Sequence, residues 1–153
     1  MNILALDCGT RTGWAVWYGG GPAFESGVQS FELRRGESAG ERFIRFRAWL
    51  RGVLMTSAPA AVVYKRPHVQ GGPAVELLIG MTTRIAEECA AFGVEPAAVY
   101  SATLKKFATG SGRGDRVGLM KHAREAWELS AVDGSEADAL CLLSWALKAH
   151  GEK

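Results

Sequence analysis

The first thirty residues alternate short apolar runs with glycine-rich turns, which restricts how this part of the chain can fold. Residues 2–6 (NILAL) form one apolar run that ends at Asp7, and the turn CGTRTG leads into a second run over residues 14–18. The next turn, GGGP, favours a return strand over residues 23–28. The chain is therefore predicted to open with an antiparallel meander of three short strands.

A long amphipathic segment follows over residues 39–56. Apolar residues recur there at steps of three and four, and arginines lie between them, as is typical of a helix. We expect a core-facing helix with a solvated basic face, and a DNA-facing role is the alternative. The apolar positions are Phe43, Phe46, Leu50, Val53 and Leu54, and the basic positions are Arg42, Arg45, Arg47 and Arg51.

Two more strands and further helices complete the expected order. Strands are predicted over residues 61–64 and 97–100, and helices over 74–92, 115–129 and 135–150. Ser101 is a plausible N-cap for the segment ATLKKFA. The order βββ-α-β-α-β-α-α predicts an α/β fold, in which helices flank a mixed five-stranded sheet.

Composition limits the class of protein. At 153 residues the whole chain, residues 1–153, is expected to be one domain with a sizeable core. A net charge of +2 is too small to indicate nucleic-acid binding by itself. The odd number of cysteines, without a CxxC pair, argues against a disulfide framework or a zinc site and suits a cytoplasmic protein. No apolar run approaches the roughly 18 residues that a membrane span needs.

Three charged residues stand where this architecture would place chemistry. Asp7 ends the first strand, Lys65 ends the fourth, and Asp138 lies one turn into the last helix. Open α/β sheets hold their sites at the carboxyl ends of their strands. A divalent-metal site and an ordinary helix cap or solvated charge are both compatible with this spacing.

Four motifs, in order along nearly the whole chain, resemble a known family. They are LALDCGTRTGWAV, VVYKRPHVQGG, TLKKFATGSGRGD and EADALCLLSWAL. Together they resemble the RuvC-like Holliday junction resolvases, particularly the bacteriophage branch, within the RNase H-like superfamily. The resemblance implies a homodimeric endonuclease with an RNase H-like fold. In that family, acidic residues hold two Mg²⁺ or Mn²⁺ ions that cut four-way DNA junctions symmetrically.

The resemblance also assigns positions. Asp7 matches the first-strand ligand and Asp138 the aspartate of the final helix. The family's other acidic position in that helix is Ser135 here, so Asp133 or Glu136 is expected to supply the carboxylate instead. Lys65 stands where the family has a glutamate.

Lys65 changes what this site is expected to do. An ammonium group cannot ligate a cation and repels one. We therefore expect Lys65 to pair with Asp7 and Asp138 and to leave the chain inactive as a nuclease; the alternative is a lysine whose stem merely lies along the strand end. A natural pseudoenzyme and a deliberately disabled variant would look the same.

Basic and hydroxyl residues near the motifs are candidate DNA contacts, because phosphate binding uses cations, hydroxyls and backbone amides. An ordinary solvated loop is the alternative for the segment TLKKFATGSGRGDR. His68 occupies the place of a family aromatic that meets the junction centre, although the sequence favours an ordinary loop histidine. The candidates are Arg11, Arg66, His68, Lys105, Lys106, Thr109, Ser111, Arg113, Arg116 and Lys121.

Other functions are also compatible with the sequence. A non-catalytic junction-binding protein and a YqgF-like nuclease acting on RNA precursors both fit the fold. The turn LDCGTRTG also resembles the phosphate-binding hairpin of actin-like kinases, but those enzymes need two such domains. For the homodimer, the helix over residues 74–92 is expected to supply the surface, through Leu77, Leu78, Met81 and Ile85.

Overall fold

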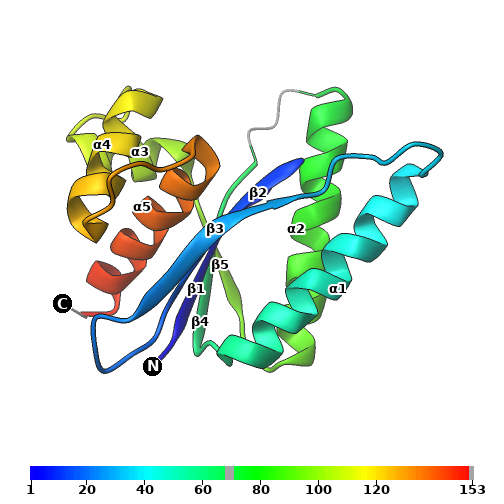
Figure 1. The fold of residues 1–153 in the computed structure, drawn as a ribbon, viewed down its shortest axis with the longest axis horizontal. Helices are drawn as coiled ribbons and strands as arrows, with labels where there is room; N and C mark the ends of the chain where they lie inside the picture. The colour runs from blue at the N-terminus through cyan, green and yellow to red at the C-terminus, as the bar shows by residue number, and fades with distance from the viewer. Residues whose placement is uncertain (68–70, 152–153) are drawn as a thin grey trace.

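The computed structural model describes residues 1–67 and 71–151, so His68 lies outside the described residues. Its centre is a mixed sheet in the order β3-β2-β1-β4-β5 (Figure 1). The first three strands form the predicted antiparallel meander, and the last two run parallel to β1. The strands are β1 (Ile3–Asp7), β2 (Arg11–Trp17), β3 (Phe24–Ser30), β4 (Ala61–Lys65) and β5 (Pro96–Val99).

Helices cover both faces of this sheet. One face carries α1 (Ala39–Ser57) and α2 (Pro73–Ala91). The other carries α3 (Ser101–Thr109), α4 (Arg116–Trp127) and α5 (Gly134–Ala149), which Figure 1 shows on the opposite side from α1 and α2. The fold is therefore the α/β arrangement that the sequence predicts, with helices in two layers around one sheet.

The helices after β5 differ from the prediction in two details. Three helices follow that strand where the predicted order has two, because the segment around ATLKKFA forms a nine-residue helix of its own. The expectation that Ser101 caps this helix is wrong. Ser101 is its first helical residue, and Tyr100 occupies the N-cap position without a side-chain hydrogen bond.

Strand β1 is buried on both faces, and its alternation decides which way Asp7 points. Ile3 and Ala5 belong to the core beneath α5, whereas Leu4 and Leu6 belong to the core beneath α1 and α2. Successive residues of a strand face opposite sides of the sheet. Asp7 therefore follows Ile3 and Ala5 toward α5, and Lys65 follows Val63 to the same face in β4.

Helix α1 packs as predicted, and its arginines are held within the molecule. Phe46, Leu50 and Leu54 are fully buried. Its arginines form hydrogen bonds or ion pairs with neighbouring segments: Arg42 with the carbonyl of Phe31, Arg45 with Glu37, Arg47 with Glu87 and Arg51 with Glu88. These contacts fasten α1 to α2 and to the segment that precedes α1.

The expected role of α2 in a dimer surface is wrong for two of its four residues. Met81 and Ile85 are fully buried in the core that α2 shares with α1. Residues that fill the interior of one chain cannot form the contact between two chains. Among the described helices, none is long and apolar enough to cross a membrane.

Candidate functional site

The site lies where β1 and β4 end beneath the first turns of α5. Gly13 of β2 allows this helix to approach the sheet, because a Cβ atom at that position would overlap the carbonyl group of Ser135. The close approach places Asp138, which is one turn into α5, over the ends of both strands. Strand alternation and this glycine together bring the three predicted residues to one point.

Lys65 bridges the two buried aspartates. Its Nζ lies 2.7 Å from Oδ2 of Asp138 and 3.3 Å from Oδ1 of Asp7. Both carboxylates are shielded from water, since Asp7 is 7% exposed and Asp138 only 2%. Arg116, at the start of α4, adds a second cation 3.6 Å from Oδ2 of Asp138. The ion pairs expected of Lys65 are therefore present.

Burial and charge oppose each other in this cluster. Burial raises the pKa of Asp7 to about 6; Lys65 acts to lower this pKa, and Asp138 adds to the rise. Burial disfavours the ammonium form of Lys65, but Asp7 and Asp138 outweigh that effect and raise its pKa. Lys65 is therefore charged at neutral pH and serves as the counter-ion of both carboxylates.

One oxygen of the cluster has no protein partner. Oδ1 of Asp138 is buried and accepts no hydrogen bond from the described residues, whereas Oδ2 contacts both Lys65 and Arg116. A buried, unpaired acceptor is costly.

Two hollows adjoin the cluster, and both are lined by Lys65 and Ser101. The larger, about 260 Å³, also contacts Asp7, Cys8 and Arg66. The smaller, about 190 Å³, also contacts Lys105, Arg116 and Asp138. Three of the side chains around the smaller hollow carry positive charge and one carries negative charge, which suits an anionic ligand.

The other two predicted carboxylates, Asp133 and Glu136, form their hydrogen bonds outside this cluster. Asp133 accepts from the backbone N–H of Ser135 at 2.9 Å and pairs with Arg11 at 3.1 Å, so it caps α5. The hydrogen bond from Ser135 is the main cause that lowers the pKa of Asp133. Glu136 accepts a hydrogen bond from Ser26 of β3 at 2.8 Å. Each carboxylate therefore has a structural partner.

The residues at this point do not fit a divalent cation. Within residues 1–67 and 71–151, no three histidine, cysteine, aspartate or glutamate side chains are grouped so that they could hold a metal ion. The ammonium of Lys65 lies between the two buried carboxylates and would repel such an ion. Hard cations such as Mg²⁺ need several oxygen ligands. Among the described residues, this cluster offers two carboxylates, and both pair with Lys65.

The remaining candidate DNA contacts divide into three groups. Lys105 lines the smaller hollow, and Arg66 extends over the ring of Tyr100 at 5.1 Å. Lys106, Arg113 and Lys121 are exposed. The hydroxyl groups of Thr109 and Ser111 bond within their own loop: Thr109 donates to the carbonyl of Lys105, and Ser111 accepts from the backbone N–H of Arg113.

Sequence reasoning missed two residues of the cluster. Arg116 was expected as a DNA contact at the start of the predicted helix over residues 115–129, but its contact with Asp138 was not expected. The predicted start of that helix at Asp115 agrees with its N-cap, but no local signal marks the contact with Asp138. Ser101 was expected only as a helix cap, whereas it lines both hollows.

Comparisons with known proteins identify the fold. No protein-family model matches the sequence, and no curated protein matches it. Among solved structures, the chain is similar to RuvC of Thermus thermophilus, with a TM-score of 0.81 and 22% identity over 99% of this chain and 96% of that one. It is also similar to T. thermophilus RuvC in complex with a Holliday junction substrate, with a TM-score of 0.82, 21% identity and the same coverage. The predicted RNase H-like fold is confirmed.

Proposed function

We propose that this chain is a RuvC-like protein that binds four-way or other branched DNA as a homodimer but does not cleave it. The observation that carries the proposal is the ammonium of Lys65, held between Asp7 and Asp138 at 3.3 and 2.7 Å. A carboxylate at position 65 would complete an acidic cluster of three. A lysine there instead forms ion pairs with the other two.

The fold supports the choice of ligand. A structure to which this chain is similar is described as a complex with a Holliday junction substrate. In this chain, Lys105 and Arg116 line the hollow beside Asp138, and Arg66 is exposed beside the hollow that contacts Asp7. Cations gathered at the ends of the strands would receive the phosphates of a DNA backbone.

The same residues support a proposal for the lineage of the site. We propose that the domain, residues 1–153, descends from a crossover junction endodeoxyribonuclease of the bacteriophage branch that used Mg²⁺ or Mn²⁺ for phosphodiester hydrolysis. Asp7 and Asp138 would be the ligands that remain from that site. The cysteines Cys8, Cys89 and Cys141 are free, which suits a cytoplasmic location.

Within this proposal the cluster has a binding role. Lys65 compensates the charge of the buried carboxylates, so that a phosphate can approach the smaller hollow without meeting two unpaired anions. Arg116 and Lys105 then supply donors to the phosphate oxygens. A four-way junction has two-fold symmetry, and a homodimer would present one such hollow to each of two equivalent strands.

A gel-shift experiment at one stated salt concentration tests the proposal. The chain is titrated against a four-way junction, a linear DNA duplex of matched length and a structured RNA, all in EDTA. We expect the junction to bind at least tenfold more tightly than the duplex. Equal affinity for junction and duplex would refute it, and preference for the RNA would favour the RNA-processing alternative.

A further inference from the structure

Helix α3 separates the candidate site from a second hollow on its other side. Neighbouring residues of a helix point about 100° apart, so Lys105 lines the site, whereas Lys106 lines this second hollow. The hollow measures about 820 Å³ and is open to solvent. We call it the α3–α5 groove; it is lined by Thr103, Lys106, Phe107, Trp145, Lys148 and Ala149.

The two lysines of the groove give it a positive charge. Lys106 and Lys148 are exposed, and none of the ion pairs among the described residues includes either. Nζ of Lys148 lies 5.8 Å from the centre of the Phe107 ring. Because no described carboxylate forms an ion pair with either lysine, the groove favours an anionic ligand.

Aromatic side chains form the apolar part of the groove. Phe107 and Trp145 are both partly exposed, one from each helix. The ring of Phe107 is supported from behind by His122, at 5.4 Å between ring centres. Aromatic rings beside cations are what proteins use to hold unpaired nucleotides, since the bases stack on the rings and the phosphates pair with the cations.

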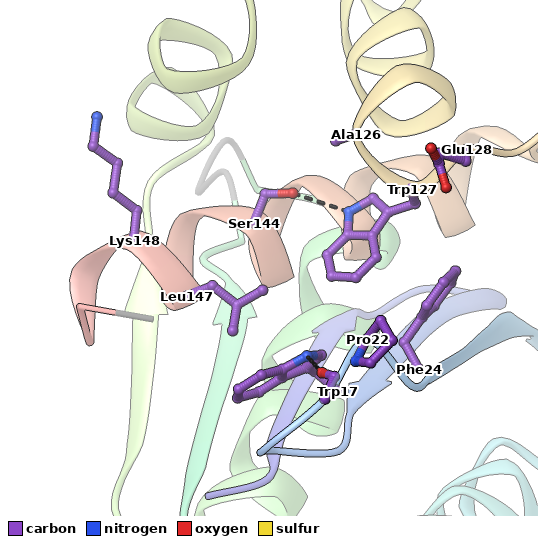
Figure 2. A pocket seen from close by; sticks show the side chains of 10 residues that line it. Trp17, Pro22, Phe24, Ala126, Trp127, Glu128, Ser144, Leu147 and Lys148 are labelled. Carbon is purple, nitrogen blue, oxygen red and sulfur yellow. Dashed lines mark hydrogen bonds between the residues drawn. The ribbon is translucent and has the colours of Figure 1, made fainter. Parts of the chain in front are cut away.

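A neighbouring hollow is also lined by aromatic side chains, but it differs from the α3–α5 groove. Figure 2 shows this hollow, of about 470 Å³, with Trp17, Phe24 and Trp127 around it; Glu128 and Lys148 also line it. Its indole donors are used internally: Trp17 donates to the carbonyl of Gly21, and Trp127 donates to Ser144. Lys148 lines both hollows, and its Nζ lies over the ring of Phe107, so its charge also contributes to the α3–α5 groove.

We infer that the α3–α5 groove binds an unpaired stretch of DNA strand next to the junction. Paired bases hide their faces inside the duplex, so stacking on Phe107 or Trp145 selects single-stranded segments. Lys105 and Lys106 are adjacent on α3, so one strand can pass from the site over α3 into the groove. The inference rests on the proposed function for its choice of DNA as the ligand.

A fluorescence titration with a short oligothymidine tests the inference. A dye-labelled strand is followed by anisotropy in EDTA at several salt concentrations. We expect Lys106→Ala with Lys148→Ala to weaken binding at least tenfold and to reduce the salt slope by about 1.4, at about 0.7 for each lost phosphate contact on a single strand. The matched control is Arg34→Ala with Arg35→Ala, which removes two exposed charges before α1.

A second readout isolates the stacking. Tryptophan fluorescence of the parent chain should fall when oligothymidine binds, and Trp145→Phe should remove most of that change. An abasic strand of the same length should bind at least tenfold more weakly than oligothymidine. Equal loss in the lysine and control variants, or undiminished quenching in Trp145→Phe, would overturn the inference. The gel shift with junction and duplex is separate, so a failure there remains distinguishable from a failure here.

Discussion

Replacing Lys65 by methionine should make the stability of the protein strongly dependent on pH. Methionine keeps most of the aliphatic stem and removes the charge that contacts Asp138 at 2.7 Å and Asp7 at 3.3 Å. Of these two carboxylates, both buried to more than nine-tenths, Asp138 would then keep Arg116 at 3.6 Å, whereas Asp7 would keep no ion pair among the described residues. Removing one partner of a buried ion pair costs about 3 kcal/mol or more.

The pKa of Asp7 gives the direction of the pH dependence. Burial raises this pKa from 3.8 to about 6, so the folded chain holds the proton more tightly than the unfolded chain. A raised pKa contributes stability that is complete below pH 3.8 and is lost as the pH rises through about 6. At about 1.36 kcal/mol for each pKa unit, the difference of 2.2 (6 − 3.8) corresponds to about 3 kcal/mol.

Lys65 acts to lower the pKa of Asp7, so Lys65→Met should raise this pKa above 6 and extend the loss of stability to higher pH. At pH 8 we expect the variant to be less stable than the parent by about 3 kcal/mol, or ~6–12 °C in melting temperature for a chain of this size. At pH 5 the gap should narrow, because Asp7 is then largely protonated in both proteins.

Thermal denaturation followed by circular dichroism at pH 5 and pH 8 measures this difference. The matched control is Lys121→Met, which removes an exposed charge from α4 and should change stability by less than about 0.5 kcal/mol at either pH. If Lys65→Met melts with the parent at pH 8, or if the gap is the same at both pH values, the electrostatic account of the cluster is wrong.

Further changes test α3, the seat of α5 and the metal site. Replacing Lys105 and Lys106 by alanine should weaken junction binding and reduce its salt slope by about 1.6, at about 0.9 for a duplex phosphate lost with Lys105 and about 0.7 for a single-strand phosphate lost with Lys106; an unchanged slope would show that α3 does not contact the backbone. Gly13→Ala should lower the free energy of unfolding, measured in urea, by about 2–3 kcal/mol, because the added methyl group overlaps the Ser135 carbonyl. The control Gly52→Ala in α1, whose methyl group meets nothing within 4 Å, should raise the free energy of unfolding by about 0.5–1 kcal/mol. Equal effects of the two substitutions would mean that Gly13 does not allow the close approach of α5. Lys65→Glu should make the melting temperature rise with millimolar Mg²⁺, whereas the parent should show no rise; an equal rise in both would mean that metal binds elsewhere.

The position of the cluster could be predicted because it depends on local patterns. The apolar run before Asp7 and the strand before Lys65 each end with a charged residue on the same face of the sheet. Neighbouring parallel strands bring such ends together, and the apolar residues around Asp138 indicate a helix packed on that sheet. Each of these signals lies within a few residues of the side chain that it places.

Features that depend on contacts between distant segments could not be predicted in the same way. The contact between Glu136 and Ser26 joins α5 to β3, 110 residues apart, and no local pattern marks it. Arg116 meets Asp138 only because α4 begins beside α5. An apolar residue on one face of a helix can lie in the core or in a dimer surface, and the sequence does not distinguish the two. The packing of α2 against α1 shows that Met81 and Ile85 lie in the core.

Junction cleavage by the parent chain and by Lys65→Glu tests the central claim most directly. Both proteins are incubated with a labelled four-way junction, in Mg²⁺, in Mn²⁺ and in EDTA, and the products are separated on a denaturing gel. We predict that both bind the junction, that the parent yields no product under any condition, and that Lys65→Glu yields symmetrically placed cuts only when metal is present. Metal-dependent cutting by the parent would contradict the claim that Lys65 has replaced the metal centre.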